Sequence, residues 1–198
     1  MTAPIRPATE SDAAAAARLH ASLISDGFLS SLGPAFLTRL YRRIVLEPAS
    51  FMFVATGDDS IPAGFIAGTE DTGRLYRAFL LHDGPGTAIR SLGPLARNGR
   101  RVVETLRYPR AAPAAGPALP KAELLAMAVA PGQRGRGLGA ALVARFQDEM
   151  GQRQPGGACV TVGAANTTAA SLYRRCGFRL RTTIEVHRGA PSELLVWP

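Results

Sequence analysis

A short apolar run followed by a glycine-rich turn is the feature that most constrains how this chain folds. Residues Leu124–Ala130 are apolar over a length that suits a buried strand. A Pro-Gly pair ends that strand, and the sequence Gln-Arg-Gly-Arg-Gly-Leu-Gly follows at residues 133–139. Apolar residues then recur at helical spacing from Leu138 to Met150. The segment therefore predicts a strand, a glycine-rich turn and the N-terminus of a helix.

Such a turn is suited to a phosphate group. Glycines adopt left-handed dihedrals and allow the backbone to approach a ligand closely. The first N–H groups of a helix have no partner within the helix and carry partial positive charge. Arg134 and Arg136 add two full charges beside them. We expect this turn to bind phosphate or pyrophosphate.

Two common phosphate-binding loops fit the sequence poorly. A Walker loop requires Lys followed by Ser or Thr at the start of the helix, and neither is present. The dinucleotide fingerprint G-x-G-x-x-G/A is matched by Gly135, Gly137 and Ala140. However, that fingerprint expects an acidic residue in or after the next strand, and the next predicted strand at residues 158–163 contains none. A Rossmann fold is therefore not predicted.

A third interpretation rests on resemblance to a known family. The pattern Arg134-x-x-Gly137-x-Gly139 resembles the pyrophosphate loop of the GCN5-related N-acetyltransferases (the GNAT family), which bind acetyl-CoA. The stretch Asn166–Phe178 looks like the second signature of that family, N-x-x-A-x-x-x-Y followed by Gly-Phe. Upstream, Ile5–Asp12 is similar to the opening strand and helix start, and Ala63–Gly68 to the third strand. The resemblance implies acetyl-CoA as co-substrate, without a metal.

The resemblance also implies the fold. We expect an α/β protein of the α+β type, with one domain over residues 1–198 and a mixed central sheet of about six to seven strands flanked by helices. A chain of 198 residues with 46% hydrophobic and 19% charged residues suits a single globular domain. An arginine-rich insert and a Pro/Ala loop at about 74–120 match no motif. The loop is not read as a domain boundary, because the next strand belongs to the same sheet.

Periodicity and turn residues predict the other elements. Helices are expected at residues 13–25, from 34 to near 48, at 75–81 and at 167–176. Strands are expected at residues 5–6, 51–56, 61–69, 158–163, 178–187 and 193–197. Residues 57–60 should close a hairpin, and residues 188–191 should form the last turn.

Acetyl transfer to an amine needs a base for the amine and an acid for the departing thiolate. The resemblance assigns Tyr173 as the acid, since a phenol with a pKa near 10 can protonate a thiolate with a pKa of about 8.5. The alternative is that Tyr173 packs beside Leu172 and Phe178. Glu123 is the predicted general base, acting through water. Its alternative role is a solvated carboxylate beside Lys121.

The resemblance also implies how the co-substrate is held. Its pantetheine arm should follow the strand at residues 127–129, where a backbone N–H would stabilise the oxyanion. Asn166 could cap the next helix, bind the co-substrate, or do both. The predicted binding residues are Met127, Ala128, Val129, Arg134, Gly135, Arg136, Gly137, Leu138, Gly139, Ala140, Asn166 and Tyr173. The three histidines, of which His187 is a second candidate base, show no metal-ligand spacing and no partner in the sequence.

The net charge of +8 comes almost entirely from arginine. A basic chain can bind nucleic acid, an acidic membrane or an anionic ligand. Aromatic residues are nearly absent from the arginine cluster, and no apolar run approaches the ~20 residues that span a bilayer. We therefore expect no nucleic-acid partner and no membrane partner. The insert carries arginines 90, 97, 100, 101, 107 and 110 against the single acid Glu104. This favours an anionic acceptor, unless the arginines form a solvated helical face.

These features predict an N-acetyltransferase that moves an acetyl group directly from acetyl-CoA to a primary amine of a small molecule or amino sugar. The alternatives are a regulatory domain that binds acetyl-CoA without turnover, and an acetyltransferase of a protein or peptide amine. The first residues do not resemble a secretory signal, and Cys159 and Cys176 are read as core residues rather than a disulfide. We expect a cytoplasmic protein, with a small-molecule amine as partner and a homodimer as the assembly to test.

Overall fold

The computed structural model describes residues 3–24, 29, 32–57, 62–83, 119–153, 156–187 and 190–198, without the side chains of residues 186, 187 and 190. They form a mixed seven-stranded sheet in the order β1-β2-β3-β4-β5-β7-β6. Neighbouring strands are antiparallel except β4 and β5, which are parallel. The predicted mixed sheet of about six to seven strands is confirmed.

The elements agree with the predicted ones to within a few residues in most places. The strands are β1 (Ile5–Pro7), β2 (Ser50–Thr56), β3 (Pro62–Thr69), β4 (Glu123–Val129), β5 (Ala158–Gly163), β6 (Arg179–His187) and β7 (Ala190–Trp197). The helices are α1 (Ala13–Leu23), α3 (Pro34–Leu46), α5 (Leu138–Arg153), α6 (Thr167–Arg175) and a helix over residues 72–83, with short 3₁₀ turns η1 (Glu10–Asp12) and η3 (Pro131–Gln133).

The predicted last turn differs from the structure. Ala190 and Pro191 belong to β7, where Pro191 pairs with Glu185. A proline is tolerated in a strand near its first residue, where the missing N–H breaks no ladder. The carbonyl of Pro191 still accepts a hydrogen bond from the Ala164 N–H at 2.9 Å. Residues 188 and 189 lie outside the described residues.

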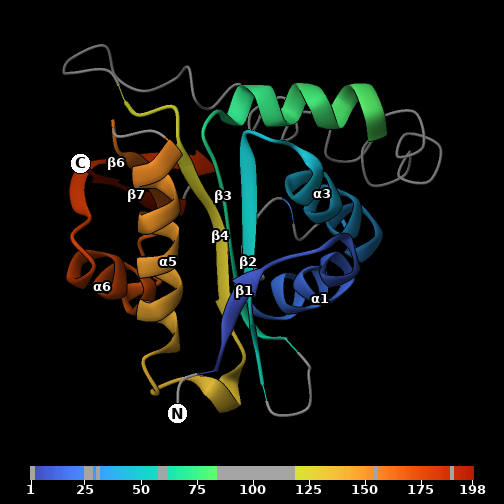
Figure 1. Ribbon diagram of the computed structural model, residues 1–198. Coiled ribbons are helices and arrows are strands. Elements are labelled where there is room, and N and C mark those ends of the chain that lie inside the picture. The colour runs from blue at the N-terminus through green and yellow to red at the C-terminus, as the bar shows by residue number, and fades with distance from the viewer. Residues whose placement is uncertain are drawn as a thin grey trace.

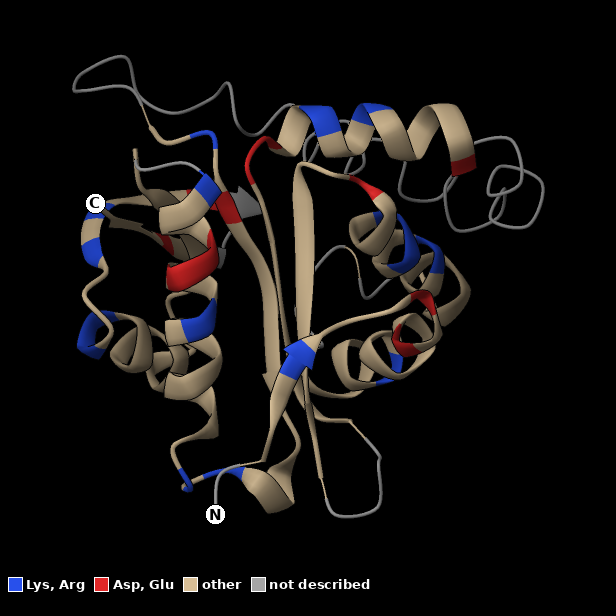
Figure 2. Cartoon of the chain, in the orientation of Figure 1, with Lys and Arg blue, Asp and Glu red and all other residues tan. Residues whose placement is uncertain are grey.

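Helices cover both faces of the sheet, with α1 and α3 on one side and α5 on the other (Figure 1). Phe51 and Phe53 of β2 point to the α5 side, whereas Met52 and Val54 point to the α1 and α3 side. A strand buried on both faces reads as a continuous apolar run, which is why β2 shows no alternation in sequence. Charged residues accordingly lie mainly on the helices and connecting segments, while the strands of the sheet carry few of them (Figure 2).

Close packing of α5 on β3 depends on a glycine. A Cβ at Gly68 would lie 2.5 Å from Cε2 of Phe146 and 2.8 Å from Cζ of Phe51. Any larger residue would therefore displace these aromatic rings from the core. The glycine in the predicted third strand is thus explained by the approach of α5.

A capping box formed by Thr9 and Asp12 opens the first helical segment and is reinforced by an ion pair. The carboxylate of Asp12 accepts from the Thr9 N–H at 2.8 Å, and Arg6 donates two hydrogen bonds to it at 2.8 and 2.9 Å. The Arg6 guanidinium, together with the bonds from Thr9, lowers the pKa of Asp12 to about 2. This pair joins β1 to the start of α1.

Asp12→Asn should lower the free energy of unfolding by about 1–2 kcal/mol at neutral pH, because charged hydrogen bonds are lost beside a half-exposed arginine. A depressed carboxyl pKa stabilises the fold above the unfolded value of about 3.9, and this contribution disappears as the pH falls toward 2. Urea unfolding from about pH 7 to about pH 2 should therefore show the two proteins converging in acid. Glu10→Gln, which breaks an exposed pair with Arg42, is the control and should change stability by less than about 0.5 kcal/mol. A pH-independent loss in Asp12→Asn would contradict the assignment.

Candidate functional site

The sheet opens between β4 and β5. In the described chain these strands share one register pair, Glu123 with Cys159, and the Cys159 N–H donates to the Ala122 carbonyl at 2.9 Å. Beyond this pair a cavity of about 1360 Å³ separates them. Residues 124–129 form one wall, and Thr161 with Gly163 of β5 contributes to the other. A cavity at a point where parallel strands diverge is a common location for a ligand.

A β-bulge interrupts β4 at the start of this cavity. Ala126 pairs with Ala67 of β3, but the next pair joins Leu124 to Gly68. Leu125 is therefore the extra residue. Because it has no partner on β3, the alternation of backbone N–H and C=O groups between the two sides of β4 shifts by one residue at this point. Bulges bend a strand and re-aim its groups, and here the bend coincides with the separation from β5.

The backbone of β4 directs alternate groups toward the cavity rather than toward a neighbouring strand. The Ala130 N–H donates to the Ala63 carbonyl of β3 at 2.8 Å. Because successive residues of a strand point in opposite directions, Ala128 also faces β3, whereas Met127 and Val129 face the cavity. Backbone groups at such an edge need a partner, which an extended ligand can provide. Of the three residues predicted to hold the pantetheine arm, Met127 and Val129 have the suitable backbone direction.

The glycine-rich turn lies at the end of this edge. Gly135 and Gly137 have φ values of 75° and 80°, in the left-handed region that favours glycine. Helix α5 begins at Leu138, so the N–H groups of its first turn point out of the helix end. The Arg134 Nε donates to the Val129 carbonyl at 3.1 Å and joins the turn to the strand. The predicted strand, turn and helix N-terminus are confirmed.

Asn166 closes the cavity from the side of β5. It is the N-cap of α6, and its side-chain oxygen accepts from the Ala169 N–H at 3.1 Å. Both residues line the cavity. The helix-capping half of the expectation for Asn166 is confirmed, and its contact with a co-substrate stays a prediction.

Glu123 lies in the cavity wall with two residues of the helix over residues 72–83. The Thr72 hydroxyl donates to Glu123 Oε2 at 2.9 Å, and Tyr76 lines the same wall. Burial raises the pKa of Glu123, and the bond from Thr72 partly opposes that rise. Burial, with a smaller effect of Glu123, raises the pKa of Tyr76. A half-buried carboxylate with a raised pKa is a stronger base than a solvated one.

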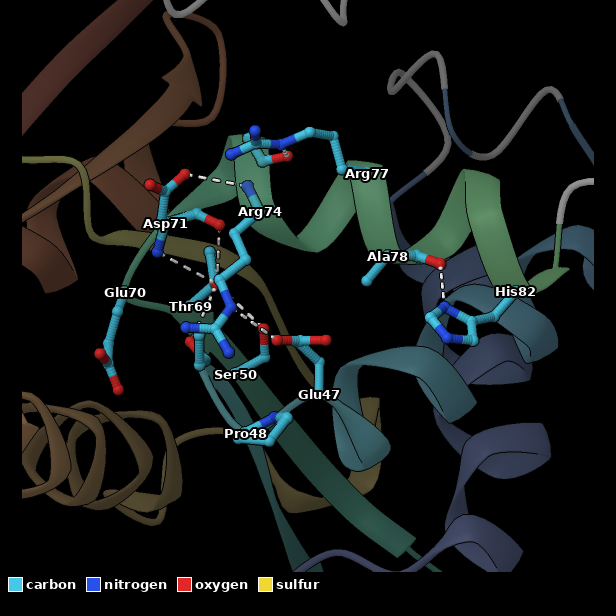
Figure 3. A network of polar contacts seen from close by, with 12 residues as sticks. Glu47, Pro48, Ser50, Thr69, Glu70, Asp71, Arg74, Arg77, Ala78 and His82 are labelled. Carbon is cyan, nitrogen blue, oxygen red and sulfur yellow. Dashed lines mark hydrogen bonds and ion pairs between the residues drawn. The ribbon is translucent and has the colours of Figure 1, made fainter.

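A polar network fixes the start of the helix that carries Thr72 (Figure 3). The Asp71 side chain accepts from the Arg74 N–H at 3.0 Å, as a capping residue does. The Arg74 side chain donates to Glu47 at 3.0 Å, which joins the helix to the end of α3. The Thr69 hydroxyl accepts from the Asp71 N–H at 3.3 Å, so the turn before the helix is also held. Thr72 is therefore positioned beside Glu123 by structure outside the cavity.

Tyr173 occupies a different environment. It is 5% exposed, and its ring lies 5.6 Å from that of Phe178. Burial, followed by nearby Cys176, raises the pKa of Tyr173. Its helix neighbours Leu172 and Cys176 line the cavity, whereas Tyr173 itself is not among the lining residues. Tyr173 therefore packs against Phe178, as the alternative interpretation expects. Its role as an acid stays a prediction.

The structure thus gathers nearly all of the predicted site residues. They line one cavity, with two exceptions. Arg136 is exposed, and Tyr173 is buried outside the cavity lining. Sequence reasoning missed Thr72, Tyr76 and the buried pair His20 and Tyr41. No local signal indicates these residues, since Thr72 meets Glu123 across 51 residues. The six arginines of the insert, between residues 90 and 110, lie outside the described residues, as does the side chain of His187.

The described residues include no group of three or more His, Cys, Asp or Glu side chains that could hold a metal ion. None of their helices has the length and apolar character needed to cross a membrane. Cys159 is free and buried, and Cys176 is free and half-buried.

Comparison with known proteins agrees with this architecture. The sequence model of the acetyltransferase (GNAT) family matches residues 19–178. A structure titled histone acetyltransferase HPA2 and related acetyltransferase, from Corynebacterium glutamicum, is 19% identical, with a TM-score of 0.61 over 100% of this chain and 97% of that one. NAA60 of Arabidopsis thaliana in complex with acetyl-CoA is 17% identical, with a TM-score of 0.62 over 99% and 98%.

A third similar structure is a GNAT superfamily phosphinothricin acetyltransferase from Sinorhizobium meliloti in complex with AcCoA. It is 16% identical, with a TM-score of 0.62 over 100% of this chain and 89% of that one. At these identities the structural likeness is one of fold. No curated protein matches the sequence.

Proposed function

Because the chain belongs to the GNAT family of acetyltransferases, we propose that it transfers the acetyl group of acetyl-CoA directly to a primary amine of a small molecule. The observation that supports this most is the open edge of β4, with Glu123 at one end and the glycine turn at the other. We propose one catalytic domain over residues 1–198, since β1 and β7 from its two ends belong to the same sheet. The two free cysteines favour a cytoplasmic location.

The cavity offers a continuous path for an extended co-substrate. The pyrophosphate would lie at the first turn of α5, where free N–H groups, the backbone of Gly137 and the charge of Arg134 meet. The pantetheine arm would then follow β4 and exchange main-chain hydrogen bonds with Met127 and Val129. This arrangement brings the thioester toward the bulge at Leu125 and the carboxylate of Glu123.

The chemistry needs no covalent enzyme intermediate. Glu123 accepts a proton from the ammonium group through water, and the neutral amine nitrogen attacks the thioester carbonyl carbon. A cavity-facing N–H of Met127 or Val129 donates to the oxygen that becomes negative. The C–S bond then breaks, and the leaving thiolate takes the phenolic proton of Tyr173. The proton that the acylated nitrogen loses as it becomes an amide passes through water to the tyrosinate, which restores Tyr173, and Glu123 returns its own proton to solvent. The raised pKa keeps Tyr173 protonated at neutral pH, as this role requires.

The test is release of free thiol from acetyl-CoA in the presence of primary amines, with acetylated product identified by mass spectrometry. The panel should contain small aliphatic and aromatic amines, amino sugars and peptides with a free N-terminus. Thiol release with small amines supports the proposal. Turnover with peptides alone would favour a peptide acetyltransferase. Acetyl-CoA binding without thiol release for any amine would favour a regulatory domain.

Tyr173→Phe should lower the turnover rate by about 10²-fold, the lower end of the range for general acid catalysis, because a buried phenol is a weak acid. Affinity for acetyl-CoA should be retained, since the ring and its packing on Phe178 remain. Phe178→Leu is the matched control, because it alters the same packing and keeps the phenol. Steady-state kinetics should be measured where chemistry limits the rate. Unchanged turnover in Tyr173→Phe, or an equal loss in Phe178→Leu, would leave Tyr173 as a packing residue.

A further inference from the structure

The cavity extends to a region that the proposed chemistry does not use. Its walls there come from α1, α3 and two described residues between these helices, Ile24 and Leu29. The polar members are His20 and Tyr41, and the apolar members are Leu23, Ile24, Leu29, Leu40 and Ile44. An apolar region with few polar groups is typical of a small-molecule pocket, in which the polar groups fix orientation.

His20 and Tyr41 form a buried pair in this wall. His20 Nδ1 lies 2.6 Å from the Tyr41 hydroxyl oxygen, and the two rings meet edge to face at 5.8 Å. The His20 residue is 3% exposed. Its other ring nitrogen, Nε2, has no hydrogen-bond partner among the described residues. A buried polar atom without a partner is costly, and such atoms frequently mark a site that a ligand completes.

The number of hydrogen bonds that each tautomer of His20 leaves unsatisfied favours one of the two. If Tyr41 donates to Nδ1, the proton of His20 is on Nε2, and Nε2–H is the one donor left without a partner. If Nδ1–H donates to Tyr41 instead, both Nε2 and the hydroxyl hydrogen lack partners. The first arrangement leaves fewer unsatisfied groups and is therefore favoured. Burial lowers the pKa of His20 to about 4, so the ring is neutral at neutral pH.

The charges around this wall limit what Nε2–H can bind. Arg134 lies in the turn after β4 and Arg175 lies on α6, and among the described lining residues no Lys or Arg comes from α1 or α3. Burial and the neighbouring Tyr76 raise the pKa of Tyr41, so that hydroxyl is neutral as well. The carboxylate of Glu123 further disfavours a second negative charge in the same cavity. An uncharged oxygen is the ligand group that suits a neutral donor here.

Given the proposed function, we propose that His20 determines acceptor specificity by donating a hydrogen bond from Nε2–H to an uncharged oxygen on an amine with an apolar body. The apolar body lies against Leu40 and Ile44, and the oxygen is an ether, hydroxyl or carbonyl. Tyr41 acts as a positioning residue, because its hydroxyl holds the tautomer of His20.

The first test compares amines that differ by one CH₂-to-oxygen replacement: hexylamine with ethoxypropylamine, and phenylpentylamine with benzyloxypropylamine. In the wild type, kcat/KM should be higher for the ether of at least one pair by about tenfold, the effect of one buried hydrogen bond. His20→Phe keeps a ring in the wall and should abolish that preference, while KM for acetyl-CoA stays unchanged. His82→Phe, at an exposed histidine on the helix over residues 72–83, should keep it.

Two kinetic results would overturn the assignment. One is the absence of any ether preference in both pairs, or its persistence in His20→Phe. The other is a kcat/KM for aminohexanoate that exceeds that for either ether and falls in His20→Phe. That result would mean that His20 binds a carboxylate rather than an uncharged oxygen. Tyr41→Phe provides a second variant if His20→Phe fails to fold. It should weaken the ether preference by releasing the tautomer, and an unchanged preference would contradict the positioning role.

A second test does not depend on turnover. Ring nitrogen NMR of histidine, assigned with His20→Phe, should show Nε2 protonated and Nδ1 unprotonated in the wild type. Addition of benzyloxypropylamine should shift the Nε2 resonance more than phenylpentylamine does. The opposite tautomer, or equal responses to the two amines, would overturn the proposal for His20. If instead thiol release is absent for every amine while the resonance responds as expected, the acetyl-transfer proposal fails and the binding role of His20 stands.

Discussion

Gly137→Val should weaken acetyl-CoA binding by about 10²-fold or more, because the glycine turn depends on a backbone conformation that valine strongly disfavours. Gly137 has a φ of 80°, and a β-branched residue there is strained by about 1–3 kcal/mol. Valine would relieve the strain by rotating to negative φ, which turns the neighbouring N–H groups away from the proposed phosphate site. Titration calorimetry with acetyl-CoA should detect this loss directly.

The chain offers a matched control for this experiment. Gly132 lies in η3, five positions before Gly137, and is not a residue of positive φ or of the cavity lining. A Cβ at either glycine meets no atom within 4 Å, so neither substitution crowds the folded protein. Gly132→Val should therefore bind acetyl-CoA like the wild type. Equal affinities for all three proteins would show that the turn does not hold the co-substrate.

Glu123→Gln should lower kcat/KM by about 10²–10⁴-fold, the range expected when a general base is removed. It should also change the pH profile. Since the carboxylate is the active form, activity should rise with pH through the pKa of Glu123, which burial raises above that of an ordinary glutamate. That acidic limb should be absent in Glu123→Gln. Retention of the limb with unchanged kcat/KM would assign the base elsewhere.

Thr72→Val separates the role of the carboxylate from general damage to the site. Its hydroxyl donates to Glu123 and so lowers the pKa of that carboxyl. Removal of this hydrogen bond should raise the pKa of Glu123 and move the acidic limb of the pH profile to higher pH. Full activity should be recovered at pH values above the new pKa. Lys121→Ala, at an exposed residue near Glu123, should leave the limb in place. A limb that moves in Lys121→Ala and stays in Thr72→Val would contradict this account.

The glycine turn and its flanking elements could be predicted because everything that forms them is adjacent in the sequence. The apolar run of β4, the Pro-Gly stop, the glycines and the apolar spacing of α5 occupy one continuous stretch. Left-handed φ at Gly135 and Gly137 and the capping of α6 by Asn166 are also local properties. Local patterns of this kind depend on backbone sterics and on hydrogen bonds between residues a few positions apart.

The order of the strands and the composition of the cavity depended on contacts between distant residues. Periodicity shows which face of a strand is buried, but it does not reveal that β7 lies between β5 and β6. The bulge at Leu125 has no local signal, because it is a mismatch in pairing with β3. The pair His20 and Tyr41 joins α1 to α3, and sequence inspection alone found no partner for His20.

The sequence by itself therefore determined the strand, the glycine turn and the helix, together with the family to which the chain belongs. Only the tertiary structure decided which side chains share the cavity with that turn. The physical reason is that a phosphate site is built largely from backbone groups of one segment, whose geometry short-range interactions set. The surroundings of Glu123 are instead assembled from Thr72 and Tyr76, more than forty residues away in sequence. Their positions follow from the packing of the whole sheet and its helices.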